Sequence, residues 1–109
     1  MTTKETVLEG AEFKSEDVTL RNGQRISVSE MSGASRDAIE ASWSNGGRDE
    51  FRARLIIACA RGSDGELLFT GSDFDAIRAA PAGYFEPIVD KALDINGYTS
   101  SEREALEGN

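Results

Sequence analysis

The sequence predicts a small, single α+β domain in which an N-terminal β-hairpin packs on three to four helices. In "DVTLRNGQRISV", apolar residues alternate on both sides of an Asn-Gly turn, which predicts two paired strands. The segments that follow instead carry apolar residues three and four positions apart, the spacing of amphipathic helices. Strands followed by a run of helices are typical of α+β domains.

The length of 109 residues fits one domain with one modest core. We expect that domain to span residues 17–97. Residues 1–16 are polar with scattered apolar side chains, and they predict a flexible N-terminal arm. Residues 98–109 predict a short C-terminal helix that frays.

The hairpin is predicted to run from Asp17 to Val28. Asn22 and Gly23 separate its two strands, and both residue types tolerate positive φ angles. We therefore expect a tight turn in which this pair supplies the positive φ angles.

Two helices are predicted after the hairpin. The first runs from Ser32 to about Trp43 and is ended by "SNGG" at 44–47. The second spans roughly Arg48 to Ala60. Its predicted core stripe follows helical spacing and consists of Phe51, Leu55, Ala58 and Cys59.

The C-terminal half predicts further helices. "SDGELLF" could be a strand, an extended connector or the lead-in to the next helix, and the extended form is favoured. A short helix after it ends before Pro81, because the residue preceding a proline avoids helical geometry. A longer helix then runs up to the Asn-Gly pair of "DINGY". It begins either near Phe85, or at Pro81 with a kink at Pro87.

Three residues are predicted to be structural helix caps. Ser32 and Ser72 each precede a helical segment, where a hydroxyl can accept a backbone N–H that lacks a partner. Thr99 is followed three residues later by Glu102, the spacing of a capping box.

The formal charge of −8 is divided evenly, with −4 in residues 1–50 and −4 in residues 51–109. This balance would repel a phosphate backbone, so no nucleic-acid partner is expected. One cysteine cannot form an internal disulfide, which fits a reducing compartment. No signal peptide or membrane-spanning run is visible, and no membrane partner is expected.

Residue types that carry catalysis are scarce. The chain has no histidine and one cysteine, so the commonest general base and zinc ligands are absent or isolated. Ser32, Ser35 and Asp37 lie close in sequence, but no neutral base is near them, and the serines are interpreted as turn and cap residues. We therefore expect no enzyme activity, no catalytic residue, no metal site and no cofactor.

Two charged segments have structural interpretations. Asp73 and Asp75 could suggest calcium, but they fall in the first turn of a predicted helix, where negative charge is favourable. A calcium loop would need more oxygen ligands. Four arginines are expected to pair with nearby carboxylates on a solvated helix face: Arg48, Arg52, Arg54 and Arg61.

Tyr84 and Phe85 are candidates for a partner-binding surface. They lie beside a helix-disturbing proline and exceed what such a small core needs. Phe74 and Tyr98 complete the set of predicted partner-binding residues. Trp43 and Phe69 are expected to be mainly core.

Three stretches together resemble the tail assembly chaperones of long-tailed bacteriophages: "ISVSEMSGASRDAIEASW", "FRARLIIACARGSDGELLFTGSDFDAI" and "ALDINGYTSSEREALEGN". They cover roughly residues 17–109 in the family's order and spacing. Two positions depart from the family pattern. Ser35 replaces the glutamate of a capping box, and Pro87 stands where the family usually continues a helix.

The resemblance implies a non-enzymatic protein that binds the tape measure protein, keeps it soluble and helps to recruit the major tail tube protein. It also implies a location in the host bacterial cytoplasm and absence from the mature virion. Self-association and a frameshift-extended form stay open. The alternative function is a small acidic decoy or inhibitor of a host nucleic-acid-binding protein, which the even spread of charge disfavours.

Overall fold

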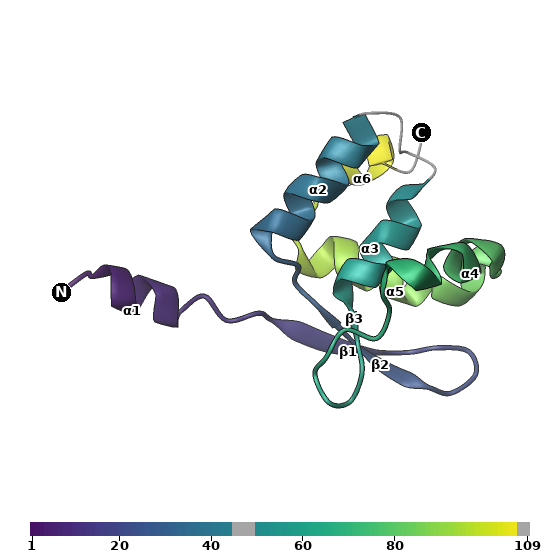
Figure 1. Ribbon diagram of the computed structural model, residues 1–109, viewed down its shortest axis with the longest axis horizontal. Coiled ribbons are helices and arrows are strands. Elements are labelled where there is room, and N and C mark those ends of the chain that lie inside the picture. Colours follow the sequence, from purple (N-terminus) through teal and green to yellow (C-terminus); the bar gives the residue numbers. More distant parts are fainter. Residues whose placement is uncertain (45–49, 107–109) are drawn as a thin grey trace.

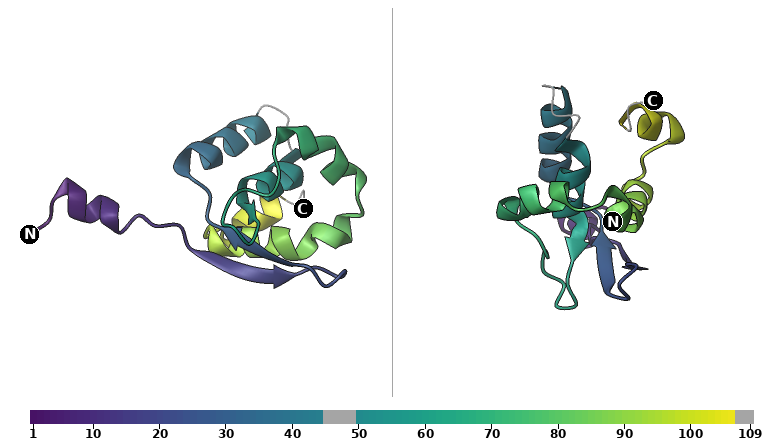
Figure 2. Two further views of the ribbon diagram at one scale, coloured as in Figure 1. Left: turned by 60° about the horizontal axis from the view of Figure 1, so that its bottom comes forward. Right: turned by 90° about the vertical axis from the view of Figure 1, so that its right-hand side faces the viewer.

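The computed structural model describes residues 1–44 and 50–106 and has the predicted α+β class. The strands form a three-stranded antiparallel sheet, and helices cover one face of that sheet (Figures 1 and 2). The elements are α1 (Lys4–Glu9), β1 (Ser15–Thr19), β2 (Arg25–Ser29), α2 (Gly33–Ser44), α3 (Phe51–Cys59), β3 (Ala60–Arg61), a 3₁₀ helix (Gly71–Asp73), α4 (Phe74–Ala79), α5 (Ala82–Ile95) and α6 (Ser100–Leu106).

The predicted hairpin is present, but its turn differs from the expected one. β1 and β2 are antiparallel, with Val18 opposite Ile26. Gly23 has φ +88°, whereas no described non-glycine residue has positive φ. The Gly23 N–H donates to the Leu20 carbonyl, and the Leu20 N–H donates to the Gln24 carbonyl, each at 2.8 Å. The loop is therefore a three-residue turn closed by a glycine bulge, and Asn22 does not supply a positive φ angle.

Sequence reasoning missed the third strand. At Ala60 the backbone leaves the helix with φ −77° and ψ 127°. Ala60 then pairs with Val28, and Arg61 with Ser27. The "SDGELLF" segment folds back from this strand, and an isolated bridge joins Arg61 to Leu67. Two residues are too few to show strand periodicity, so only the neighbouring β2 makes this segment a strand.

α5 lies on the sheet against β1 and β2, and α3 lies on α5 (Figure 2). α2 and α4 each pack against α3. Because α3 has neighbours on three sides, it is buried on more than the predicted stripe. Ala53 and Ile56 are buried with Phe51, Leu55 and Cys59, whereas Ala58 is half-buried. The predicted helix start at Arg48 lies outside the described residues, as do positions 45–47 of the predicted "SNGG" end of the preceding helix.

The start of α5 follows the second of the two predicted alternatives, since the helix begins directly after Pro81. The predicted kink at Pro87 stays a prediction. Pro87 lies inside the helix, beyond its first turn, where it cannot donate a backbone hydrogen bond to the preceding turn. The helix ends at Ile95, and Asn96 is its C-cap, followed by Gly97 with φ +75°. The Tyr98 N–H donates to the Leu93 carbonyl at 3.0 Å, which makes a Schellman ending.

Two predicted caps lie at helix starts. Ser32 Oγ accepts the Ser35 N–H at 3.1 Å in front of α2. Thr99 and Glu102 exchange hydrogen bonds in front of α6, with Thr99 Oγ1 accepting at 3.1 Å and the Glu102 carboxylate accepting at 2.9 Å. Ser32 therefore has a structural role as the cap of α2.

The third prediction, that Ser72 is a helix cap, is wrong. Thr70 holds the N-cap position of the 3₁₀ helix, where its Oγ1 accepts the Ser72 N–H at 3.3 Å. The Asp73 carboxylate accepts the Thr70 N–H at 2.8 Å in return. Thr70 and Ser72 both carry a hydroxyl group that could cap a helix. Because a 3₁₀ turn precedes α4, the cap is the earlier residue, Thr70.

Asn96 joins the C-terminus of α5 to the rest of the core. Its Oδ1 accepts the Met31 N–H at 3.0 Å, and its Nδ2 donates to the Ala92 carbonyl at 2.8 Å. Nδ2 also lies 3.6 Å from Cys59 Sγ. Arg36 donates to the Asn96 carbonyl at 2.8 Å. One side chain thus fixes the turn before α2 and the end of α3 relative to α5.

Cys59 is expected to be unreactive in the folded protein. Its side chain is fully buried, and burial raises the pKa of the thiol to about 11, so the nucleophilic thiolate is scarce near neutral pH. At pH 8 a chromogenic thiol reagent should label Cys59 slowly in buffer and at once in denaturant. Stoichiometric labelling of the folded protein within the mixing time would contradict this burial.

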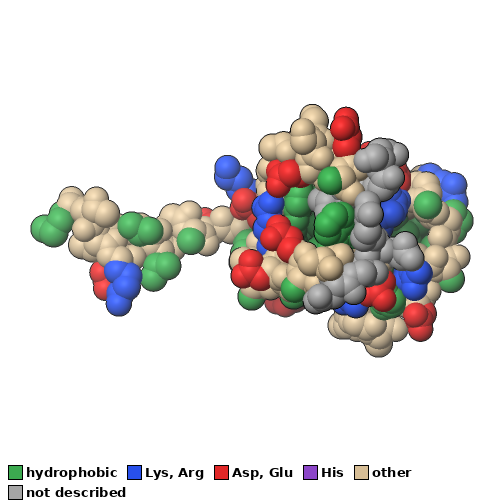
Figure 3. All heavy atoms as spheres, turned by 90° about the horizontal axis from the view of Figure 1, so that it is seen from above, with side chains coloured by type: hydrophobic (Ala, Val, Ile, Leu, Met, Phe, Trp, Pro, Cys, Tyr) green, Lys and Arg blue, Asp and Glu red, His purple; other side chains and the backbone are tan. Residues whose placement is uncertain are grey.

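The N-terminal arm extends away from the body, and α1 has no buried residue (Figures 1 and 3). Thr3 and Thr6 form a reciprocal cap at its start. Val7, Leu8 and Phe13 are exposed. Figure 3 shows hydrophobic side chains along the extension. The division into arm, domain and C-terminal helix stays a prediction. No described helix is long and apolar enough to cross a bilayer.

Candidate functional site

A groove of about 710 Å³ lies on the surface between the tip of the hairpin, the loop after β3 and the first turn of α5. We call it the aromatic groove. Its lining residues are Leu20, Gln24, Arg25, Ile26, Arg61, Gly62, Ser63, Asp64, Leu68, Phe69, Tyr84 and Phe85. Volumes of this order hold the side chains of a bound ligand or partner segment.

Three aromatic rings form one wall of the aromatic groove. Tyr84 and Phe85 meet edge to face with ring centroids 5.1 Å apart, and Phe69 meets Phe85 in the same way at 6.2 Å. All three are half-buried, so each ring keeps surface that a partner can cover. Leu68, beside them, is among the exposed large apolar residues.

Arginines stand around the aromatic groove, and we call Arg21, Arg25 and Arg61 its basic rim. The Arg21 guanidinium lies 5.5 Å from the centre of the Tyr84 ring. Arg25 pairs with Asp17 at 3.1 Å, and both side chains are exposed. Arg61 is held more firmly, because it donates to Ser29 Oγ at 2.9 Å.

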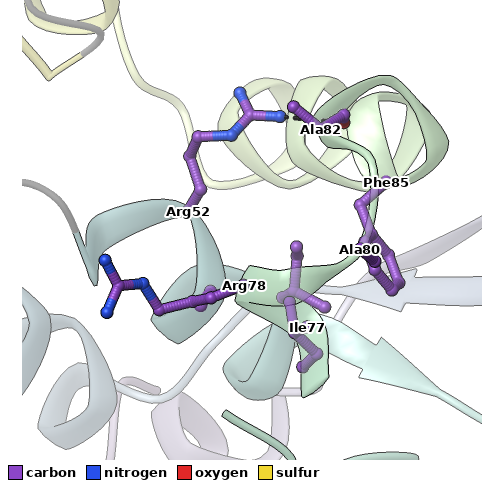
Figure 4. A pocket seen from close by; sticks show the side chains of 8 residues that line it. Arg52, Ile77, Arg78, Ala80, Ala82 and Phe85 are labelled. Carbon is purple, nitrogen blue, oxygen red and sulfur yellow. Dashed lines mark hydrogen bonds between the residues drawn. The ribbon is translucent and has the colours of Figure 1, made fainter. Parts of the chain in front are cut away.

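Figure 4 shows a smaller hollow of about 230 Å³ that Phe85 also lines. Phe85 therefore lies between this hollow and the aromatic groove. Ile77 and Phe85 contribute apolar side chains to the smaller hollow, and Arg52 reaches across to the Ala82 carbonyl at 3.2 Å. Arg52 also pairs with Glu86. Its guanidinium therefore has partners within the fold.

A second apolar groove, of about 470 Å³, lies where α2, α3 and the start of α4 meet. Phe74 lines it, and the guanidinium groups of Arg54 and Arg78 lie 5.3 and 5.5 Å from the Phe74 ring centre. We call this the Phe74 groove. Arg54 also pairs with Glu50, the carboxylate pairing that the sequence predicted.

The structure brings two of the four predicted partner-binding residues together. Tyr84 and Phe85 share the aromatic groove, and Phe74 lies in the other groove. Tyr98 requires a correction, because it is 8% exposed and packs edge-on against Phe51 as part of the core. The residue after a Schellman glycine commonly packs back on its helix, so "NGY" itself carried a signal for this burial.

Sequence reasoning missed most of the groove. Leu20, Ile26 and Leu68 come from the hairpin and the loop after β3, and Phe69 was expected to be mainly core. No local pattern joins these segments, since the pairing of β3 with β2 brings them together.

The polar residues that were considered for catalysis either form hydrogen bonds within the fold or lie exposed on a helix. Ser32 Oγ donates to Ser35 Oγ at 3.1 Å, while Asp37 is exposed on α2. The Asp73 carboxylate closes the cap described above. In residues 1–44 and 50–106, no three His, Cys, Asp or Glu side chains are grouped as metal ligands. Arg48 and Asp49 lie outside the described residues.

Known proteins resemble this chain in structure. A solved structure of the bacteriophage HK97 tail assembly chaperone superposes with a TM-score of 0.66, covering 92% of this chain and 100% of that chain. The chain has the fold of a phage tail assembly chaperone. The HK97 chaperone is 16% identical in sequence, so the likeness is one of fold. No family model matches the sequence, and the search of curated proteins found no match.

Proposed function

We propose that this protein is a phage tail assembly chaperone. The observation that carries the proposal is the fold shared with the HK97 tail assembly chaperone over 92% of the chain. The ordered sequence resemblance supports the same role independently of the coordinates. In this role the protein acts by stoichiometric binding, without catalysis, in the host bacterial cytoplasm, and it is absent from the mature virion.

Its proposed client is the tape measure protein, which it keeps soluble while the major tail tube protein is recruited. An acidic protein suits this work, because a net charge of −8 opposes aggregation of a complex with an apolar client. The aromatic groove supplies partly exposed rings for such binding.

Co-expression with the tape measure protein of the same phage should raise the soluble fraction of that client and co-purify the two proteins. The same client expressed alone is the control for its solubility without the chaperone. If the client stays insoluble and does not co-purify with the wild-type protein, the proposal is wrong.

The acidic-decoy alternative receives less support. A decoy needs carboxylates concentrated on one face, whereas ion pairs interleave arginines with carboxylates on the sheet, on α3 and on α5. Competition with DNA for a purified host DNA-binding protein would revive this alternative.

A further inference from the structure

The aromatic groove differs in charge from the rest of the molecule. The chain carries twenty acidic and twelve basic residues, yet three arginines surround this one groove. Two carboxylates accompany them, Asp64 in the lining and Asp17 beside Arg25. The groove is therefore locally positive in a protein whose formal charge is −8.

The strand edge on the β3 side of this groove is already occupied. β2 lies between β1 and β3, and β3 takes the bridge from Leu67 on its other side. The Leu68 N–H donates to the Ala60 carbonyl at 3.0 Å. β1 lies at the other edge of the sheet, but none of its residues line the groove. A partner in the groove must therefore bind through its side chains, as an amphipathic helix does.

We propose that the aromatic groove binds an amphipathic helix of the client whose apolar face is flanked by carboxylates, which pair with Arg21 and Arg25. This inference rests on the proposed function and specifies the chemistry of the client segment. The apolar face of that helix covers Leu68, Tyr84 and Phe85. The carboxylates lie over the basic rim.

The rim arginines are suited to different parts of this task. Arg21 has no carboxylate partner among the described residues, and its contact is with the Tyr84 ring. The Arg25–Asp17 pair is exposed, so its exchange for a partner carboxylate costs little. Arg61 is fixed by Ser29 and by the Gly65 carbonyl, at 2.8 Å from the latter, and it supplies a positioned charge.

Screening by salt decides whether a bound peptide responds mainly to the charges of the basic rim or to the net charge of the whole protein. At physiological salt the Debye length is about 8 Å, so carboxylates in contact with the rim respond mainly to the rim. An exposed ion pair is typically worth about a threefold change in affinity, so two pairs should give about tenfold.

The test uses two labelled synthetic helical peptides that share one leucine-rich apolar face and are flanked by either Glu or Lys. Fluorescence anisotropy at physiological salt should show about tenfold tighter binding of the Glu-flanked peptide. The R21E/R25E variant should reverse this preference. The K4E/K14E variant makes the same change in net charge on the arm and should keep the wild-type preference.

Four outcomes would overturn the inference. The wild-type protein could bind both peptides equally, or the Lys-flanked one better. K4E/K14E could lose the preference as fully as R21E/R25E. Phe74→Ser could weaken peptide binding where Tyr84→Ser does not, which would place the helix in the Phe74 groove. Tyr84→Ser could convert an oligomer into monomers while peptide binding persists, which would make a second copy the occupant.

Failure of this inference can be told from failure of the proposed function. If wild-type and R21E/R25E proteins solubilise the co-expressed tape measure protein equally, the chaperone proposal stands and the rim has no role in it. If neither solubilises the client while the peptides still show the charge preference, the groove has the inferred chemistry but serves another partner.

Discussion

Replacing Leu55 by alanine should lower the free energy of unfolding by about 2–5 kcal/mol. Leu55 is 0% exposed, at the centre of α3, which packs against α2, α4 and α5. Truncation leaves a cavity among these helices that no single one can move to fill. Chemical denaturation followed by far-ultraviolet circular dichroism measures the loss. A small domain has about 5–15 kcal/mol of stability, so this loss should move the denaturation midpoint by a large and easily measured amount.

Leu8→Ala is the matched control, because it makes the same chemical change at a leucine that is 64% exposed on α1. Its effect should stay within about 0.5 kcal/mol. Equal destabilisation by the two variants would mean that the arm packs on the body in solution, in conflict with its position in Figure 1.

Replacing Tyr84 and Phe85 together by serine should weaken binding of the client about 30-fold or more, while leaving most molecules folded. Both rings are half-buried on the wall of the aromatic groove, and buried aromatic anchors at interfaces are commonly worth 2 kcal/mol or more, at about 1.4 kcal/mol per tenfold. Pull-down of a solubilised tape measure fragment measures binding, and thermal unfolding of the same samples measures stability.

Two comparison variants separate a loss of client binding at the aromatic groove from a loss of folding. Phe51→Ala removes a buried ring and should mainly unfold the domain. Phe74→Ser alters a half-buried ring in the other groove and should leave client binding nearly unchanged. If the Tyr84 and Phe85 variants unfold as readily as Phe51→Ala, these rings are core residues, and the client must bind elsewhere.

Local chemistry explains which elements could be predicted. The hairpin, α2, α3 and α6 follow from alternating or helical spacing and from caps such as Ser32 and Thr99, whose hydrogen bonds join residues close in sequence. The turn at Gly23 and the cap at Thr70 differed from prediction for one reason. Several local solutions fit the same residue types, and the surrounding backbone selects one of them.

The candidate site was less accessible to sequence reasoning. Tyr84 and Phe85 could be identified as excess aromatic residues, but the same argument also selected Tyr98, which packs on Phe51 in the core. Exposure is a property of neighbours that are distant in sequence, and a single sequence does not place those neighbours.

The sequence by itself determined the α+β class, the order of most elements and the resemblance to tail assembly chaperones, because periodicity, caps and turn residues act over a few positions. Tertiary structure alone decided that Ala60 and Arg61 become a strand, that Pro87 is kept inside α5, and that an aromatic groove with a basic rim forms. The physical reason is that these features depend on contacts between segments far apart in the chain. Their stabilisation appears only when the sheet and helices pack together.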